Sequence, residues 1–187
     1  MMRKEFKVPK KEEVLEHDRR LLYAIQQSMG FIPNIYAFMT RSETALKRFL
    51  DFANVPTVFK PVETQAIHLV TSQVNQCPYC LAAHTAIAKE IGLTDEQIQL
   101  IRKGNVKWDK KLDALVHFTC ELVTNRGKVS PEMTDRFYQA GFTDAHLVDL
   151  TMLVGMTTIT NYMNNATWIP VDFPEAPVII CNCDCKE

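Results

Sequence analysis

The chain has 187 residues, of which 47% are hydrophobic and 23% are charged, values that suit one globular domain with a sizeable buried core. Its formal net charge of -1 and its pI near 6.5 provide no basic surface of the kind that nucleic acids or anionic membranes attract. We therefore expect neither of these partners.

The cysteines are informative because of the compartment that the sequence predicts. The N-terminus is charged and lacks the apolar core of a secretion signal, and no later stretch reaches the roughly 18 apolar residues of a membrane span. We therefore expect a soluble, cytoplasmic protein, in which the six cysteines are reduced thiols. Clustered thiols in that setting indicate redox chemistry or metal binding. One cluster contains Cys77 and Cys80, and a second contains Cys181, Cys183 and Cys185.

The first half of the chain shows a succession of helical patterns, separated by proline and glycine and without a strand pattern of useful length. The sequence thus predicts an all-α fold. A charged segment at residues 10–29 is followed by a turn and then by one helix from about residue 35 to residue 53. Pro61 opens the next helix, and a further helix has Pro78 in its first turn and ends at the capping Gly92.

The second half continues in the same way. Thr94 has the form of an N-cap, with a glutamine three residues later, and a longer helix is expected at residues 110–124. Ser130 caps another helix, and Asp144 lies at the start of the last one. That last helix is apolar almost all round, which indicates either deep burial or a subunit interface. Beyond Pro170 the chain is expected to be extended.

The segment Cys77-Pro78-Tyr79-Cys80 stands where a helix is expected to begin. A helix N-terminus carries partial positive charge and free amides, which favour the thiolate form of a cysteine. If the helix includes Cys80, then His84 lies one turn further on the same face and can accept the thiol proton, with Cys77 on that face as well. These groups suffice for a cycle in which a peroxide oxidises one thiol to a sulfenic acid and the other thiol closes a disulfide.

A Cys-x-x-Cys motif also has other uses. Thioredoxin-like proteins place the motif after a strand, whereas a helix is expected before it here. A structural zinc site would need a fourth ligand besides Cys77, Cys80 and His84, and His68 or the C-terminal cysteines could provide one. Inert buried cysteines are a third interpretation. Redox chemistry is favoured, because the histidine follows the motif at helical spacing.

Residues 62–84 resemble the AhpD-like alkylhydroperoxidase group of the carboxymuconolactone decarboxylase superfamily. Residues 140–144 and 161–164 are similar to that group as well, so the resemblance covers about residues 30–172. It implies an all-α fold, a homo-oligomer that is a trimer, a hexamer or a dimer, and thiol-dependent reduction of a hydroperoxide without haem, flavin or another bound cofactor. It also implies an external reductant, a dithiol such as the lipoyl group of a lipoyl-protein.

The resemblance further implies roles for individual residues. Cys80 would attack the peroxide, Cys77 would resolve the oxidised cysteine, and His84 would belong to a proton relay. In peroxidase members the base of that relay is a glutamate twelve residues before the first cysteine, and this sequence has Gln65 at that position. A glutamine cannot accept the proton, although it can position a neighbour by a hydrogen bond.

Two nearby residues are candidate substitutes in the relay. His68 lies three residues after Gln65 and therefore on the same face of the helix, although a polar residue at a packing surface would look the same. Glu63 lies about 200° round an ideal helix from Gln65, so it would serve only if the helix start is irregular. Its alternative role is that of a first-turn acid, favoured by the helix dipole.

The domain organisation follows from these patterns and from the extent of the resemblance. We expect an N-terminal helical segment at residues 1–29, an AhpD-like helical domain at residues 30–172 and a cysteine-rich tail at residues 173–187. Residues 61–92 and 143–167 repeat each other weakly, which leaves an internal duplication open, since the second copy has no cysteines.

The leading prediction is a thiol-dependent peroxidase of antioxidant defence that reduces alkyl or hydrogen peroxide. The cysteine-rich tail and Gln65 favour a different class, a thiol redox sensor or disulfide-exchange protein. Lactone decarboxylation or ring opening, for which the dithiol would be superfluous, is a further alternative. A zinc-stabilised structural module is the last one.

Overall fold

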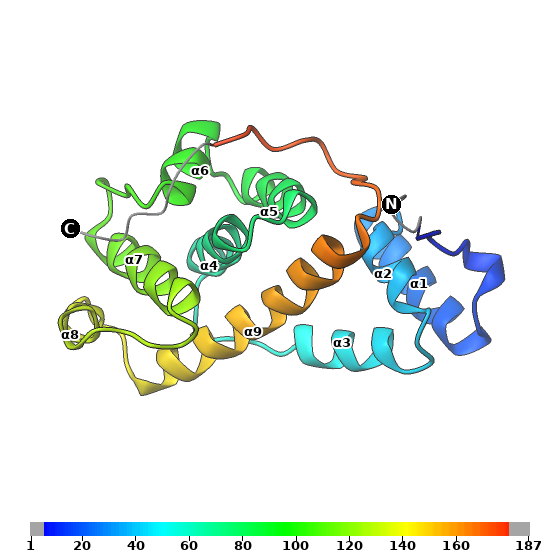
Figure 1. Cartoon of the computed structure of the whole chain (residues 1–187), viewed down its shortest axis with the longest axis horizontal. Coiled ribbons are helices and arrows are strands. Elements are labelled where there is room, and N and C mark those ends of the chain that lie inside the picture. Colours follow the sequence, from blue (N-terminus) through cyan, green and yellow to red (C-terminus); the bar gives the residue numbers. More distant parts are fainter. Residues whose placement is uncertain (1–5, 180–187) are drawn as a thin grey trace, which may run out of the picture.

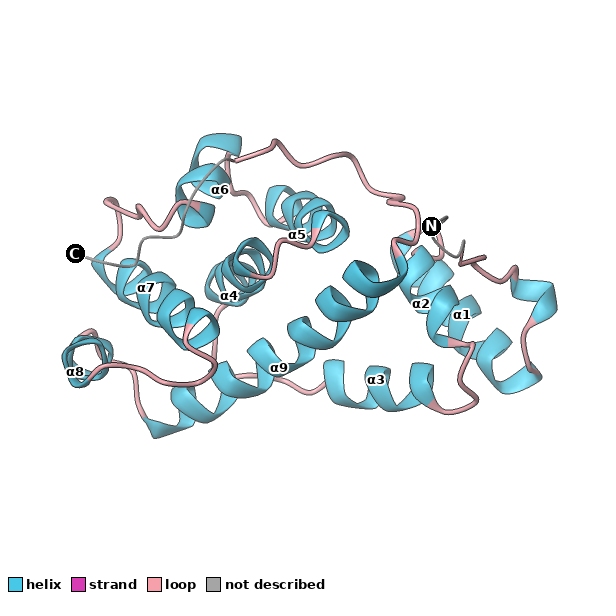
Figure 2. Cartoon of the chain, in the orientation of Figure 1, coloured by secondary structure: helices cyan, strands magenta, loops and turns pink. Residues whose placement is uncertain are grey.

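The computed structural model describes residues 6–179 of the chain. Within that range the regular elements are all helices, as Figure 2 shows, and the all-α prediction is confirmed. The elements are η1 (Lys11–Glu13), α1 (Glu16–Met29), α2 (Asn34–Met39), α3 (Ala45–Ala53), α4 (Pro61–Val74), α5 (Pro78–Glu90), α6 (Asp95–Arg102), α7 (Lys110–Thr124), α8 (Pro131–Gln139) and α9 (Asp144–Thr167). None of these helices is long and apolar enough to cross a membrane.

Helix α4 lies at the centre of the larger part of the molecule, with α5, α7 and α9 around it (Figure 1). Residues 66–72 of α4 are all buried, so the helix has no solvent-facing side in that stretch. Buried polar side chains of this stretch form hydrogen bonds. The Thr71 hydroxyl donates to the Ile67 carbonyl, and the Ser72 hydroxyl accepts a hydrogen bond from Asn161 of α9. The dithiol motif directly follows α4, so the position of this helix determines where the motif lies.

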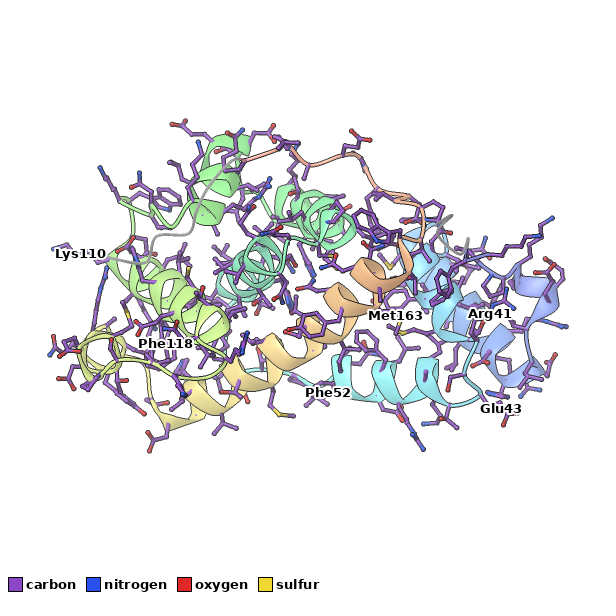
Figure 3. The ribbon with its side chains drawn as sticks, in the orientation of Figure 1. Arg41, Glu43, Phe52, Lys110, Phe118 and Met163 are labelled. Atoms are coloured by element: carbon purple, nitrogen blue, oxygen red, sulfur yellow. The ribbon has the colours of Figure 1, made fainter. Side chains whose placement is uncertain are left out.

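The hydrophobic core has two parts. The larger part lies between α4, α6, α7, α8 and α9, and there Phe118 of α7, visible between α7 and α8 in Figure 3, packs against Phe137. The smaller part lies between α1, α2, α3 and the start of α5, and it includes Leu22 of α1 together with Cys77 and Cys80. The N-terminal helices therefore cover the dithiol motif, and the proposed boundary at residue 29 stays a prediction.

The prediction of a single helix at residues 35–53 is wrong. The structure has two shorter helices there, α2 and α3, separated by the turn at residues 40–44. The Thr40 hydroxyl donates to the Ala37 carbonyl at 2.7 Å, and the Arg41 amide donates to the Phe38 carbonyl at 3.1 Å, so tight turns replace the helical bonds. The break lets α3 run beside α9 while α2 covers the start of α5 (Figure 1).

Candidate active site: a dithiol beside a small cavity

The dithiol motif follows an abrupt turn between α4 and α5. At the end of α4 the Cys77 amide donates to the Ser72 carbonyl at 3.0 Å, and the Gln76 amide donates to the Gln73 carbonyl at 3.1 Å, which together form a Schellman motif. Gln76 has a φ of 52°, a left-handed conformation that usually favours glycine. Because of this turn, α4 stops and α5 begins within three residues, and Cys77 falls at the N-terminus of α5.

Cys77 is the N-cap of α5, and Cys80 lies in the first turn of that helix, as the sequence predicts. The Cys77 Sγ accepts a hydrogen bond from the Cys80 amide at 3.3 Å, as a capping side chain does. The two sulfur atoms are 2.8 Å apart and not linked. Cys77 is 0% exposed and Cys80 is 4% exposed. The pair can therefore close into a disulfide with a small rotation of the side chains.

The hydrogen bond between the thiols makes them chemically unequal. Because the Cys77 thiol donates to the Cys80 sulfur, it holds the pKa of Cys80 below its usual value, and Asn161 and Thr160 of α9 add to this effect. The same bond, together with burial, raises the pKa of Cys77. The positive end of α5 also favours negative charge at this position. The arrangement thus favours a thiolate on Cys80 beside a protonated Cys77.

Loss of the Cys77 thiol should make Cys80 less reactive. In Cys77→Ala no side-chain donor remains at that position, so the pKa of Cys80 rises, and its alkylation by iodoacetamide at neutral pH should slow about 10-fold. Cys77→Ser keeps a hydroxyl donor and serves as the matched control, with most of the wild-type rate. Mass spectrometry of the Cys80 peptide at fixed times gives both rates. Equal rates in wild type and Cys77→Ala would show that Cys77 does not activate Cys80.

His84 follows Cys80 by one turn of α5, and both residues line the same cavity. The His84 Nδ1 lies 3.0 Å from the Oε1 of Gln65 on α4. Since an amide oxygen only accepts hydrogen bonds, the ring that makes this bond carries its proton on Nδ1 and keeps a lone pair on Nε2. Burial lowers the pKa of His84 well below its usual value, and His68 lowers it further. His84 is thus a neutral base that an amide positions.

His68 lies directly beside His84. The two rings are stacked, with 4.4 Å between their centroids, and the His68 Nδ1 lies 2.7 Å from the hydroxyl oxygen of Thr157 on α9. His68 is buried, and this burial lowers its pKa to about 4. The structure therefore brings together Gln65, His84 and His68, and both imidazoles are uncharged near neutral pH.

The buried imidazoles should make the protein sensitive to acid. His68 has a pKa of about 4 in the folded protein and about 6.5 when exposed, so the unfolded chain binds more protons between these values. Stability is complete above about pH 6.5 and falls as the pH drops toward 4. At pH 5 we expect a loss of about 2 kcal/mol from His68. Urea denaturation at pH 7 and pH 5 measures this loss, which His68→Gln should reduce; an unchanged loss in that variant would contradict the assignment.

Glu63 occupies a different place, at the N-terminal end of α4. Its carboxylate accepts a hydrogen bond from the Lys60 amide at 2.8 Å, and the Lys111 Nζ lies 3.8 Å from it. These contacts are those of a first-turn acid in a capping box. Cys77 follows the opposite end of α4, which ends at Val74. In the structure the contact with His84 comes from Gln65.

Helix α9 contributes four polar residues that sequence reasoning did not include in the site. They are Thr157, Thr160, Asn161 and Asn164. The Thr160 hydroxyl lies 3.7 Å from the Cys80 Sγ, and the Asn164 Oδ1 lies 3.7 Å from the Cys77 Sγ. Their spacing of three, one and three positions places them on one face of the helix, which the sequence alone could have indicated.

A cavity of about 110 Å³ opens beside Cys80. Cys80, His68 and His84 line it together with two threonines of α9, whereas Cys77 is not part of its wall. The rest of the wall is mainly apolar, and it includes Met29, Ile35, Phe49, Ala53, Ile87, Met156 and Phe173. An engineered apolar cavity of about 150 Å³ is large enough for benzene, so this one suits a small organic molecule.

The chain beyond α9 closes the site. Tyr79, between the two cysteines, donates a hydrogen bond to the Asp172 Oδ1 at 2.6 Å and accepts one from the Ile35 amide at 3.2 Å. The other oxygen of Asp172 accepts a bond from the Asn34 amide at 2.7 Å. The ring of Phe173 packs edge-on against Tyr79, with 5.8 Å between centroids. The starts of α2 and α5 and the segment after α9 are therefore held together at the cavity.

The second cysteine cluster, Cys181, Cys183 and Cys185, lies outside the described residues. Within residues 6–179, no three side chains of histidine, cysteine, aspartate or glutamate are grouped so that they could hold a metal ion. The functional side chains that the described site brings together include two thiols and two neutral imidazoles.

This fold and this site define an all-helical protein with a dithiol at a helix N-terminus and a cavity in front of one thiol. Residues 34–115, which contain both cysteines and both histidines of the site, match the carboxymuconolactone decarboxylase family. Over this stretch the chain is similar to that family, and the solved structures described next share its fold. No curated protein sequence matches the chain significantly.

Solved structures of similar fold include two peroxidase-related proteins and a debrominase. An uncharacterized peroxidase-related protein with an AhpD core, from Ralstonia eutropha, is 20% identical, with a TM-score of 0.80 over 89% of this chain and 91% of that chain. A peroxidase-related protein from a Silicibacter species is 18% identical, with a TM-score of 0.77 over 88% and 90%. The debrominase, in complex with 2,3,4-tribromopyrrole, is 13% identical, with a TM-score of 0.71 over 84% and 86%. At these identities the likeness establishes the fold.

Proposed function

We propose that the protein is a thiol peroxidase that reduces small organic hydroperoxides and hydrogen peroxide, with Cys80 as the attacking and Cys77 as the resolving cysteine. The observation that carries this proposal is a pair of sulfur atoms 2.8 Å apart, of which Cys80 has the lowered pKa and lines the cavity. The AhpD-like group and its peroxidase-related neighbours support an antioxidant role.

In the first step the Cys80 sulfur attacks the terminal oxygen of the hydroperoxide. The sulfur–oxygen bond forms as the oxygen–oxygen bond breaks, so Cys80 becomes a sulfenic acid and an alkoxide leaves. The proton of the Cys80 thiol passes to the Nε2 of His84 and from there to the alkoxide, which departs as the alcohol. Gln65 keeps the other ring nitrogen protonated throughout, because its Oε1 faces Nδ1.

In the second step the Cys77 sulfur attacks the Cys80 sulfur. The disulfide forms, and the hydroxide of the sulfenic acid leaves as water with the Cys77 proton. An external dithiol, such as the lipoyl group of a lipoyl-protein, then returns two electrons and two protons and becomes a disulfide itself. No further cofactor enters this cycle.

The direct test is peroxide consumption by the purified protein with dihydrolipoamide as reductant. Tert-butyl hydroperoxide and hydrogen peroxide are the probes, because both are small enough for a cavity of about 110 Å³. We expect catalytic consumption of at least one of them. Peroxide consumption no faster than that by dihydrolipoamide alone would contradict the proposal.

A second candidate is disulfide exchange without peroxide turnover, and the contact between Gln65 and His84 favours it. An amide cannot take the proton that a carboxylate at this position would accept, so the relay is shorter than in a peroxidase with glutamate there. The fold alone does not determine the reaction, since a debrominase shares it. Oxidation of the dithiol by a disulfide probe, together with a reaction with peroxide no faster than that of a free thiol, would support this candidate.

A further inference from the structure

Tyr36 of α2 lines the cavity in front of Cys80, and no step of the proposed cycle uses it. Its side chain is half-buried, and its ring packs against that of Phe49 on α3, with 6.1 Å between the centroids. The start of α2 is held against the dithiol motif, because the Ile35 amide donates to the hydroxyl of Tyr79, the residue before Cys80. Tyr36 is the next residue of α2, so this bond fixes where Tyr36 lies relative to Cys80.

Four residues of the cavity wall carry a hydroxyl group, and three of these groups donate to other parts of the protein. The Tyr79 hydroxyl donates to Asp172 at 2.6 Å. The hydroxyls of Thr157 and Thr160 donate to backbone carbonyls of α9 at 2.7 and 2.9 Å. The hydroxyl of Tyr36 forms no hydrogen bond with any of the residues 6–179 that the structure describes. Its proton is therefore available to a molecule in the cavity.

The Tyr36 hydroxyl is a neutral donor in a wall whose imidazoles offer acceptors. Burial raises the pKa of Tyr36, and the negative charge of Cys80 raises it further, so the hydroxyl stays protonated within reach of that charge. His84 has its lone pair on Nε2. The Thr157 hydroxyl gives its own proton to a carbonyl, so the Nδ1 of His68 donates to it and the lone pair of this ring is also on Nε2. Among the side chains of the described wall, Tyr36 can thus provide the donor that neither imidazole provides.

We propose that the Tyr36 hydroxyl donates a hydrogen bond to the leaving oxygen of the hydroperoxide and stabilises the alkoxide that forms when Cys80 attacks. This inference rests on the proposed peroxidase function. As the oxygen–oxygen bond breaks, its electron pair stays on the leaving oxygen, and a donor already in place lowers the free energy of that developing charge. Tyr36 keeps its own proton, since His84 delivers the proton that converts the alkoxide to the alcohol.

Tyr36→Phe tests this hydrogen bond, because it removes the hydroxyl and keeps the ring that packs against Phe49. The reduced protein is mixed with tert-butyl hydroperoxide without reductant, and the rate constant for oxidation of Cys80 is measured. The rate constant should fall about 10- to 100-fold, because a hydrogen bond to a charged oxygen is lost. Tyr162→Phe is the matched control and should react at the wild-type rate, since it removes a hydroxyl from an exposed tyrosine outside the cavity wall.

Peracetic acid as a second oxidant separates this role of Tyr36 from a structural one. Its leaving group is a carboxylate, which is far less basic than an alkoxide and depends less on a hydrogen-bond donor. Tyr36→Phe should therefore slow the reaction with peracetic acid by no more than about 3-fold. Alkylation of Cys80 by iodoacetamide releases no oxygen anion, so its rate should be that of the wild type. A general disturbance of the cavity would instead slow all three reactions together.

The outcomes distinguish this inference from the proposed function. Three results would overturn the inference and leave the peroxidase function in place. They are a wild-type rate of Tyr36→Phe with tert-butyl hydroperoxide, an equal loss with both peroxides, and an equal loss in the alkylation of Cys80. A wild type that reacts with tert-butyl hydroperoxide no faster than a free thiol does would overturn the peroxidase function itself, and the role of Tyr36 with it.

Discussion

Cys80→Ser should lower kcat/KM for hydroperoxide by at least about 1,000-fold, the largest effect that we expect from a single substitution. A serine hydroxyl stays protonated at neutral pH and is a far weaker nucleophile toward a peroxide oxygen than a thiolate. The substitution changes one atom in a side chain that is 4% exposed, so the fold should persist. Peroxide consumption with dihydrolipoamide measures the loss.

Cys77→Ser is the matched control for Cys80→Ser, and its catalytic cycle should stop at the second step, disulfide formation. Cys80 still attacks peroxide, so one equivalent per chain is consumed quickly, but no disulfide forms and Cys80 remains a sulfenic acid that dimedone traps. Turnover with the dithiol should then be slow. A fast first equivalent in Cys80→Ser and none in Cys77→Ser would reverse the two roles and contradict the cavity geometry, in which Cys80 alone of the two thiols lines the wall.

Gln65→Glu should raise kcat/KM about 10-fold or more, because it gives His84 a carboxylate partner in place of an amide. The Gln65 Oε1 is 3.0 Å from the His84 Nδ1, so a carboxylate oxygen in its place would stabilise the protonated ring and raise the pKa of His84. A gain in peroxidase activity from one substitution would show that the shortened relay limits the natural chain.

The pH dependence of kcat/KM should also change in a defined direction in the Gln65→Glu variant. His84 must be neutral to accept a proton, so in Gln65→Glu the acidic limb of the rate profile should move to higher pH as the pKa of His84 rises. Glu63→Gln is the control, since its carboxylate bonds the Lys60 amide at the start of α4 and a glutamine can keep that bond. If Gln65→Glu has the rate and the pH profile of the wild type, His84 is not on the proton path.

The helices could be predicted well wherever their ends have a local cause. The N-caps Thr94 and Ser130 mark the starts of α6 and α8, because each side chain accepts a bond from an amide three residues later in its own helix. The expected helix at residues 35–53 failed because apolar residues continue on both sides of the break. The turn after Thr40 is instead decided by how α2 and α3 pack on the start of α5 and on α9.

The contacts of the site can be separated in the same way, into those that local sequence spacing predicts and those that depend on packing between distant helices. Cys77, Cys80 and His84 belong to one helix, so their spacing in the sequence already predicts their shared face. The contacts of Thr160 with Cys80 and of Thr157 with His68 join residues about 80 to 90 positions apart, and they depend on the packing of α9 against α4 and α5. No local pattern of the sequence encodes such a contact.

The measurement that tests the central claim most directly is a titration of the reduced protein with one equivalent of hydroperoxide in the absence of reductant. The account predicts one alcohol released per chain and one disulfide between Cys77 and Cys80, identified by peptide mapping, with neither product from Cys80→Ser. Peroxide left unreacted while both thiols stay reduced, or a disulfide that forms equally fast without peroxide, would contradict it.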